Sequence, residues 1–130
     1  MRELIFRGKR IDKDEWVCGS VVFANDKINN CKTYILPGIS DFSYGDNGNR
    51  IRIGCFVEVD VSTIGQFTGL HDNKGRMIFE GDTIIWEDWH EKKIQSKVVY
   101  DPEWNRFCVW ANGAESLGVN EHLSKSIEIV

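Results

Sequence analysis

The sequence lacks the features that most directly identify an enzyme, a membrane protein or a secreted protein. Its 130 residues contain no glycine-rich phosphate loop, no HExxH motif and no Ser–His–Asp order. No apolar run approaches the roughly 20 residues needed to cross a bilayer. The N-terminus has no apolar signal-peptide segment. These absences predict a soluble, intracellular protein with no membrane partner, no cofactor and no catalytic site.

The four cysteines are Cys18, Cys31, Cys55 and Cys108, and none belongs to a CxxC or CxH pair. Close ligand pairs are the usual spacing of zinc sites. We interpret the cysteines that lie in apolar runs as small buried side chains of a reducing compartment. The alternative is a metal site or disulfides assembled from distant positions.

Proline is scarce, with two residues, whereas glycine is frequent, with twelve. Hydrophobic residues make up 42% of the chain and aromatic residues 12%, which is too apolar for intrinsic disorder. The net charge of −4 is unevenly distributed. Residues 1–35 sum to +2, residues 36–91 to −6, and residues 92–130 to zero. The acidic middle argues against one continuous phosphate-binding face.

Hydrophobicity alternates with a period of two along most of the chain, which is typical of strands. Strands are expected at residues 4–6, 16–23, 33–36, 52–59, 66–68, 77–79, 83–86, 97–100, 106–110 and 127–130. Residues 63–82 are predicted to alternate strand, tight turn, strand and tight turn. The first two strands form a hairpin, in which Gly19 is a bulge or a point of close backbone approach. The one helical candidate is residues 120–125, with Asn120 as N-cap.

This pattern predicts a mostly all-β protein with two packed β subdomains. The N-terminal subdomain covers residues 1–60 and the C-terminal one residues 61–130. Five short strands over about fifty residues suit a small SH3-like barrel, in which closure hides most sheet edges.

Three segments carry a resemblance to a known family: residues 1–10, Glu15–Gly19, and residues 63–82. The last contains Gly-Gln-Phe-Thr-Gly-Leu at 65–70 and Ile-Phe-Glu-Gly-Asp at 78–82. In these segments the chain resembles the YopX family of bacteriophage and prophage proteins. The resemblance implies a β-rich fold with an SH3-like C-terminal part, phage origin and self-association. It supplies no reaction and no catalytic residues. A phage protein without a signal segment is expected in the cytoplasm of the bacterial host cell. Similar proteins often continue past the last strand, whereas this sequence stops at Val130.

Four residues are candidates for an interface with another copy or with a host or phage protein. Tryptophan is enriched in interface hot spots, which singles out Trp89 and Trp104; the alternative for both is core packing. Gln66 and Thr68 lie between glycines, where they either contact a partner or satisfy backbone groups. Nucleic acid is a second partner class, because a short basic segment supplies four candidate phosphate contacts: Arg2, Arg7, Lys9 and Arg10.

The acidic residues around Gly81 offer one further reading. Glu80 and Asp82, with His71, could form an acid–base pocket. The simpler interpretation is that Asp82 accepts backbone N–H bonds in its own turn while Glu80 is solvated. A metal site from His90 with Glu87 or Glu91 is a minor alternative to a solvated loop.

Overall fold

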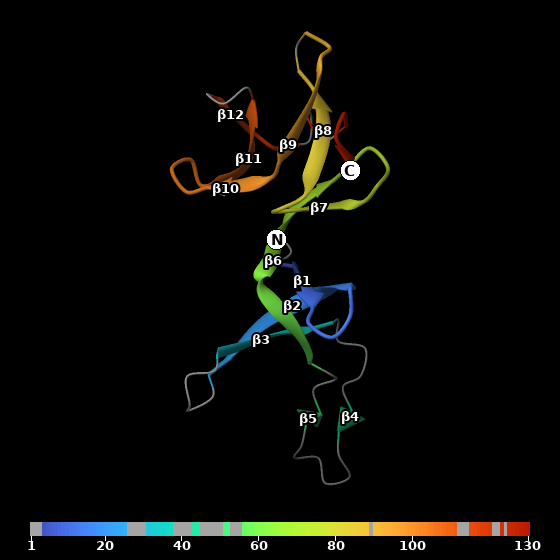
Figure 1. Cartoon of the computed structure of the whole chain (residues 1–130), viewed down its shortest axis with the longest axis vertical. Coiled ribbons are helices and arrows are strands. Elements are labelled where there is room, and N and C mark those ends of the chain that lie inside the picture. Colours follow the sequence, from blue (N-terminus) through green and yellow to red (C-terminus); the bar gives the residue numbers. More distant parts are fainter. Residues whose placement is uncertain are drawn as a thin grey trace. The chain divides into compact units, whose positions relative to one another are not determined.

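The computed structural model describes residues 4–25, 31–37, 43–44, 51–52, 56–88, 90–111, 115–120, 123 and 125–130. These residues form almost entirely β-strands in packed sheets, as the sequence predicts (Figure 1). They divide into two compact units, Leu4–Gly65 and Gln66–Val130, and the division falls inside one long strand. In the described part of the chain, no helix has the length and apolar character required to cross a membrane.

Four strands of the N-terminal unit pair in a ring, so that each strand has two neighbours. Strand β1 (Phe6–Arg10) pairs with β2 (Trp16–Asn25) and with β6 (Val57–His71), and β3 (Cys31–Leu36) also pairs with β2 and β6. The expected hairpin is confirmed, with Lys9 opposite Trp16. The short strands β4 (Ser43–Tyr44) and β5 (Ile51–Arg52) pair with each other.

The first strand corrects one expectation from the sequence. The basic run at residues 7–10 was expected to follow a strand at residues 4–6, but this run is itself β1. Alternation along a strand points successive side chains to opposite faces. Gly8 is therefore buried, whereas Arg7 and Lys9 on either side of it are half-exposed.

Two glycines allow close approach inside the ring. A Cβ at Gly19 would overlap the backbone carbonyl of Leu36, which confirms the close backbone approach expected there. A Cβ at Gly8 would lie 2.9 Å from both Ile64 Cδ1 and Val59 Cγ2. The interior of the ring therefore leaves no room for a side chain at Gly8, and β2 and β3 lie too close together for one at Gly19.

Strand β6 replaces two shorter strands that the sequence predicts. It continues through residues 60–65, which were expected to interrupt it. The polar residues there satisfy one another: Ser62 N donates to Asp60 Oδ1 at 2.9 Å, and Thr63 Oγ1 donates to the Asp60 carbonyl at 2.6 Å. Thr63 Oγ1 also accepts a bond from Lys9 N at 2.8 Å, which joins β6 to β1.

The C-terminal unit contains two three-stranded sheets and a short strand paired with the end of β6. Strand β7 (Met77–Phe79) pairs with β6. One sheet has the order β13 (Glu128–Ile129), β8 (Thr83–Glu87) and β9 (Lys93–Lys97). The other has the order β10 (Val99–Asp101), β11 (Arg106–Ala111) and β12 (Glu115–Gly118). The expected hairpin of residues 97–110 and the final strand are confirmed.

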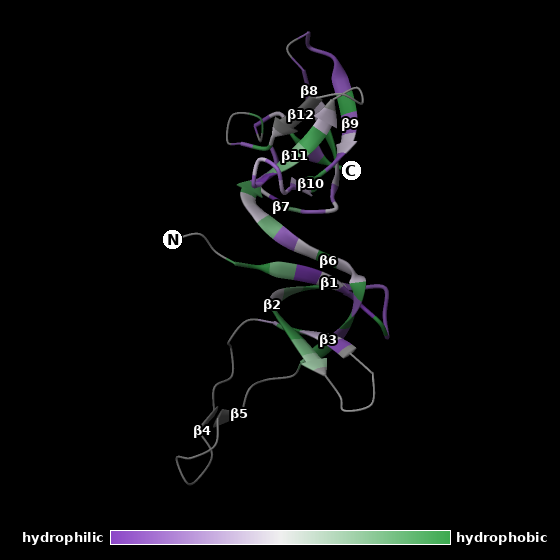
Figure 2. Cartoon of the chain, turned by 90° about the vertical axis from the view of Figure 1, so that its left-hand side faces the viewer, coloured by the Kyte–Doolittle hydropathy of each residue, from purple (hydrophilic) through white to green (hydrophobic). Residues whose placement is uncertain are grey.

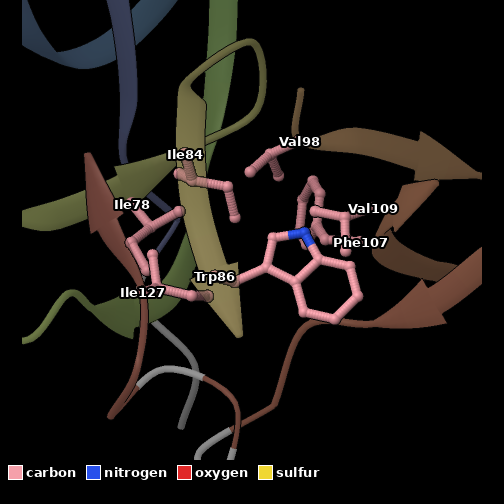
Figure 3. Packing of buried hydrophobic residues seen from close by; sticks show 7 residues of the cluster. All are labelled: Ile78, Ile84, Trp86, Val98, Phe107, Val109 and Ile127. Carbon is pink, nitrogen blue, oxygen red and sulfur yellow. The ribbon is translucent and has the colours of Figure 1, made fainter. Parts of the chain in front are cut away.

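These sheets share one apolar core, in which Trp86 is only 1% exposed. Its indole projects from β8 toward side chains of both sheets (Figure 3). The indole N–H donates to Ser96 Oγ at 3.1 Å, and that hydroxyl donates to the Trp110 carbonyl at 3.1 Å. The fully or nearly buried members are Ile78, Ile84, Trp86, Val98, Phe107, Val109 and Ile127.

Local turn and cap chemistry follows the sequence closely. Gly75 adopts a φ of 79° in the turn after Asp72, where a side chain would be strained. Asn120 Oδ1 accepts a bond from Leu123 N at 2.9 Å, which is the geometry of an N-cap, and Leu123 is helical. Residues 121, 122 and 124 of the expected helix lie outside the described residues.

Replacing Trp86 tests the core of the C-terminal unit. Trp86→Ala leaves a large cavity and removes the indole N–H that donates to Ser96 Oγ, so we expect the free energy of unfolding to fall by about 3–5 kcal/mol. Urea denaturation followed by circular dichroism measures this loss. Trp104→Ala is the control, because that ring is exposed, and its cost is expected to stay within about 0.5 kcal/mol. Equal costs for the two variants would contradict this description of the core.

Candidate interaction surfaces

The basic segment of the N-terminal unit is displayed on β1, but its charges are largely used within the hairpin. Lys9 Nζ lies 2.5 Å from Asp14 Oδ1. Arg10 binds Asp12 through two hydrogen bonds of 2.8 Å each. The hydrogen bond from Arg10 lowers the pKa of Asp12 from its usual value. These ion pairs reduce the positive potential that Lys9 and Arg10 offer to phosphates. Arg2 lies outside the described residues.

A tryptophan that the sequence did not single out sits among these cations. Trp16 is 48% exposed at the start of β2. The guanidinium of Arg7 lies 4.5 Å from the centre of its ring, and Lys9 Nζ lies at 5.8 Å. Both separations are within reach of a cation–π interaction. The hairpin register could have revealed this cluster, because it places Trp16 opposite Lys9.

The N-terminal unit leaves many large apolar side chains in solvent. Phe23 is 63% exposed and Val61 is 62% exposed. The second half of β2 is strongly hydrophobic, as its green colour shows (Figure 2). Large exposed apolar patches mark interaction sites more often than single scattered residues do. The exposed large hydrophobic residues of this unit are Leu4, Ile11, Trp16, Val22, Phe23, Phe56 and Val61.

The four interface candidates from the sequence have different environments. Thr68 is buried, and its hydroxyl donates to the Ile78 carbonyl at 2.8 Å, so this side chain helps to satisfy the backbone. Gln66 is half-buried, and its backbone carbonyl accepts a bond from Glu80 N at 2.9 Å. Trp89 lies outside the described residues.

Trp104, by contrast, is 68% exposed in the turn between β10 and β11. Asp101 Oδ1 accepts a bond from Glu103 N at 3.0 Å and a longer one from Trp104 N, which fixes the turn. The Arg106 guanidinium lies 5.7 Å from the Trp104 ring centre. Tryptophan and arginine are the residue types enriched in interface hot spots, so this turn is a second candidate surface.

Of the acidic residues around Gly81, Asp82 holds its own turn as expected, whereas Glu80 is half-buried. Asp82 is buried, and its Oδ2 accepts a bond from Phe79 N at 2.8 Å, as expected for a carboxylate that holds its own turn. Gly81 has a φ of 92°, which favours glycine. Among the described residues, no group of three His, Cys, Asp or Glu side chains is arranged to hold a metal ion.

One cysteine differs from expectation. Cys108 is buried, as predicted, but Cys18 is an exposed free thiol on β2. Partial desolvation raises the pKa of Cys18, and Arg7 offsets this only in part. Because the thiolate is the nucleophilic form, Cys18 is a weak nucleophile near neutral pH. Cys55 lies outside the described residues.

Asp72 forms a buried clasp within the C-terminal unit. Its Oδ1 accepts bonds from Arg76 N at 2.8 Å and Lys74 N at 3.0 Å. Its Oδ2 accepts bonds from Arg76 Nε at 2.9 Å and Ile129 N at 3.3 Å. Burial by itself would raise the pKa of Asp72, but these backbone and side-chain bonds outweigh it and lower the pKa. The clasp joins the β6–β7 turn to β13.

The clasp predicts a pH dependence of stability. A carboxylate whose pKa is lowered on folding stabilises the protein above its unfolded pKa, and this contribution is lost as pH falls through the folded pKa. The free energy of unfolding should therefore decrease below about pH 4. Asp72→Asn should lower the free energy of unfolding by about 2 kcal/mol or more at pH 7, and it should make that free energy less dependent on pH in acid. Urea denaturation between pH 2 and 7 measures both the loss of stability and its dependence on pH. The exposed Glu87→Gln is the control. If the free energy of unfolding of Asp72→Asn fell with decreasing pH as steeply as that of the wild type, the role assigned to Asp72 would be contradicted.

Comparison with known proteins supplies a family but no activity. Among curated proteins, no sequence matches this chain. The family model described as YopX protein matches residues 6–130, which is nearly the whole chain and includes both units. This match bears out the resemblance carried by the segments around Gly19, Gly65 and Gly81. The chain belongs to the YopX protein family.

Proposed function

We propose that this protein is a non-enzymatic accessory protein of a bacteriophage or prophage that acts in the cytoplasm of its host cell. Its role is that of an interaction module that assembles with copies of itself and binds a host or phage protein. Membership of the YopX family supports the phage context. The exposed apolar side chains support the interaction role.

The observation that carries this proposal is the exposure of large apolar residues on the N-terminal unit. Burying one such side chain contributes about 1.5–3 kcal/mol. A specific interface buries about 800 Å² on each partner. Several such side chains together supply apolar area for an interface of this size, and their burial drives association. Phe23 and Val61 are each more than three-fifths exposed in the single chain. Covering them is therefore favourable.

The C-terminal unit fits a small SH3-like barrel in this proposal. Its two three-stranded sheets enclose one core around Trp86. Small barrels of this kind present their loops to ligands. Among the described loops, the turn that carries Trp104 has the most exposed aromatic ring, and it is the proposed contact for a second protein.

Nucleic acid is the second candidate partner. Arg7 and Lys9 flank the half-exposed Trp16, and stacking aromatics beside cations are typical of single-strand binding surfaces. Two observations count against it. Arg7 already covers the Trp16 ring, and the ion pairs of Lys9 and Arg10 neutralise their charges. Self-association is therefore the better supported function.

The proposal predicts that the protein exists as a defined oligomer. Light scattering coupled to size exclusion should give a mass that is a whole-number multiple of the chain mass at micromolar concentration and above. Dilution should shift this mass toward the monomer, because association depends on concentration. High salt should not abolish the oligomer, since apolar burial rather than exposed charge drives it. A clean monomer over a broad concentration range would refute the proposal.

A further inference from the structure

We infer that the outward face of the N-terminal sheet is the surface on which a second copy of this chain docks; the inference rests on the self-association proposed above. The outward face is defined here by residues of three neighbouring strands. They are Arg7 and Lys9 of β1, Trp16, Ser20 and Val22 of β2, and Tyr34 of β3.

The strand register places these residues on one side of the sheet. Lys9 lies opposite Trp16, and Val22 lies opposite Tyr34. Directly opposed residues of an antiparallel pair share a face. The alternate residues point the other way: Thr33 and its opposite residue Val59 are both buried. On the interior face Thr33, Ile35 and Val59 are buried, whereas Phe23, opposite Thr33, is exposed. On the outward face Trp16, Ser20 and Val22 are exposed.

The outward face carries apolar side chains on two of its strands. Trp16 and Val22 are exposed on β2, and Ser20 between them is exposed as well. Beside Val22, the Tyr34 ring meets the edge of the exposed Phe56 ring at 6.3 Å between centres. Trp and Tyr supply large contact area at a small cost in side-chain entropy, which is why they dominate interface hot spots.

Charge favours a second copy as the occupant. Residues 4–65 contain eight Lys and Arg and eight Asp and Glu, so this unit has no net charge. Residues 66–130 contain seven and eleven, for a net charge of −4. Identical surfaces repel each other when they carry net charge, and neutral ones associate more readily. Two N-terminal units can therefore meet without repulsion, whereas polyanionic nucleic acid gains little from a neutral unit.

The small interior of this unit gives an independent reason for docking. Among its described residues, the buried hydrophobic side chains are Ile35 and Val59. The C-terminal unit buries a cluster of seven. Small domains with little buried apolar surface commonly need oligomerisation to reach adequate stability. A second copy on the outward face would bury the apolar surface that the ring cannot enclose.

A charge placed on the outward face tests the inference. Val22→Lys introduces an ammonium at the centre of the contact, and two copies bring two such charges together. We expect at least a tenfold weaker association in sedimentation equilibrium of the full chain, with an unchanged circular dichroism spectrum. Val130→Lys is the matched control, because it adds the same charge to an exposed valine of the C-terminal unit, which is not part of this face. Ser20→Arg is a second variant that removes no packing, since Ser20 is exposed.

The outcomes separate this inference from the broader proposal. If the wild-type chain is monomeric at all concentrations, self-association and the inference both fail. If the wild type assembles and Ser20→Arg assembles equally well, the outward face is not the contact, although self-association stands. An equal weakening by Val130→Lys would also overturn the inference. A labelled single-stranded oligonucleotide that binds at low salt and is lost in Ser20→Glu, without a change in mass, would assign the face to nucleic acid instead.

Discussion

The narrow interior of the N-terminal strand ring is the constraint on which the rest of this account depends. Strands β1, β2, β3 and β6 each pair with two of the other three, so the space they enclose is small. Gly8 occupies that space against Val59 and Ile64 because no side chain fits there. Apolar residues beyond the few that fit inside must lie outside. The exposed Trp16 and its neighbours are the consequence of this geometry, and they make the unit suited to association.

Local features of the fold were predictable from the sequence, whereas non-local pairing was not. Gly75, Asp82 and Asn120 behave as their local turn and cap chemistry requires. The continuity of β6 was missed, because residues 60–65 carry turn-forming residues whose hydrogen bonds are satisfied by one another and by Lys9 of a distant strand. Local propensity gives way to such tertiary contacts in strands.

The surface around Trp16 was predictable only in part, because it too depends on how distant strands pair. The basic residues were found from the sequence, but the partners that neutralise them follow from the hairpin geometry. Trp16 was overlooked as a surface residue because tryptophan in an apolar run resembles a core residue. The ring closure that turns it outward depends on β1 meeting β6, which no local pattern indicates. Family membership rests on the match to residues 6–130 and assigns no role to particular residues.

The most direct test of the central claim is the solvent accessibility of Trp16 as the protein is concentrated. Hydroxyl-radical labelling followed by mass spectrometry reports the oxidation of individual side chains. If the outward face is buried between copies, labelling of Trp16 should fall as the chain is concentrated from the dilute, dissociated state, while labelling of Trp104 stays constant. Unchanged labelling of Trp16 in a sample whose mass shows assembly would contradict the account.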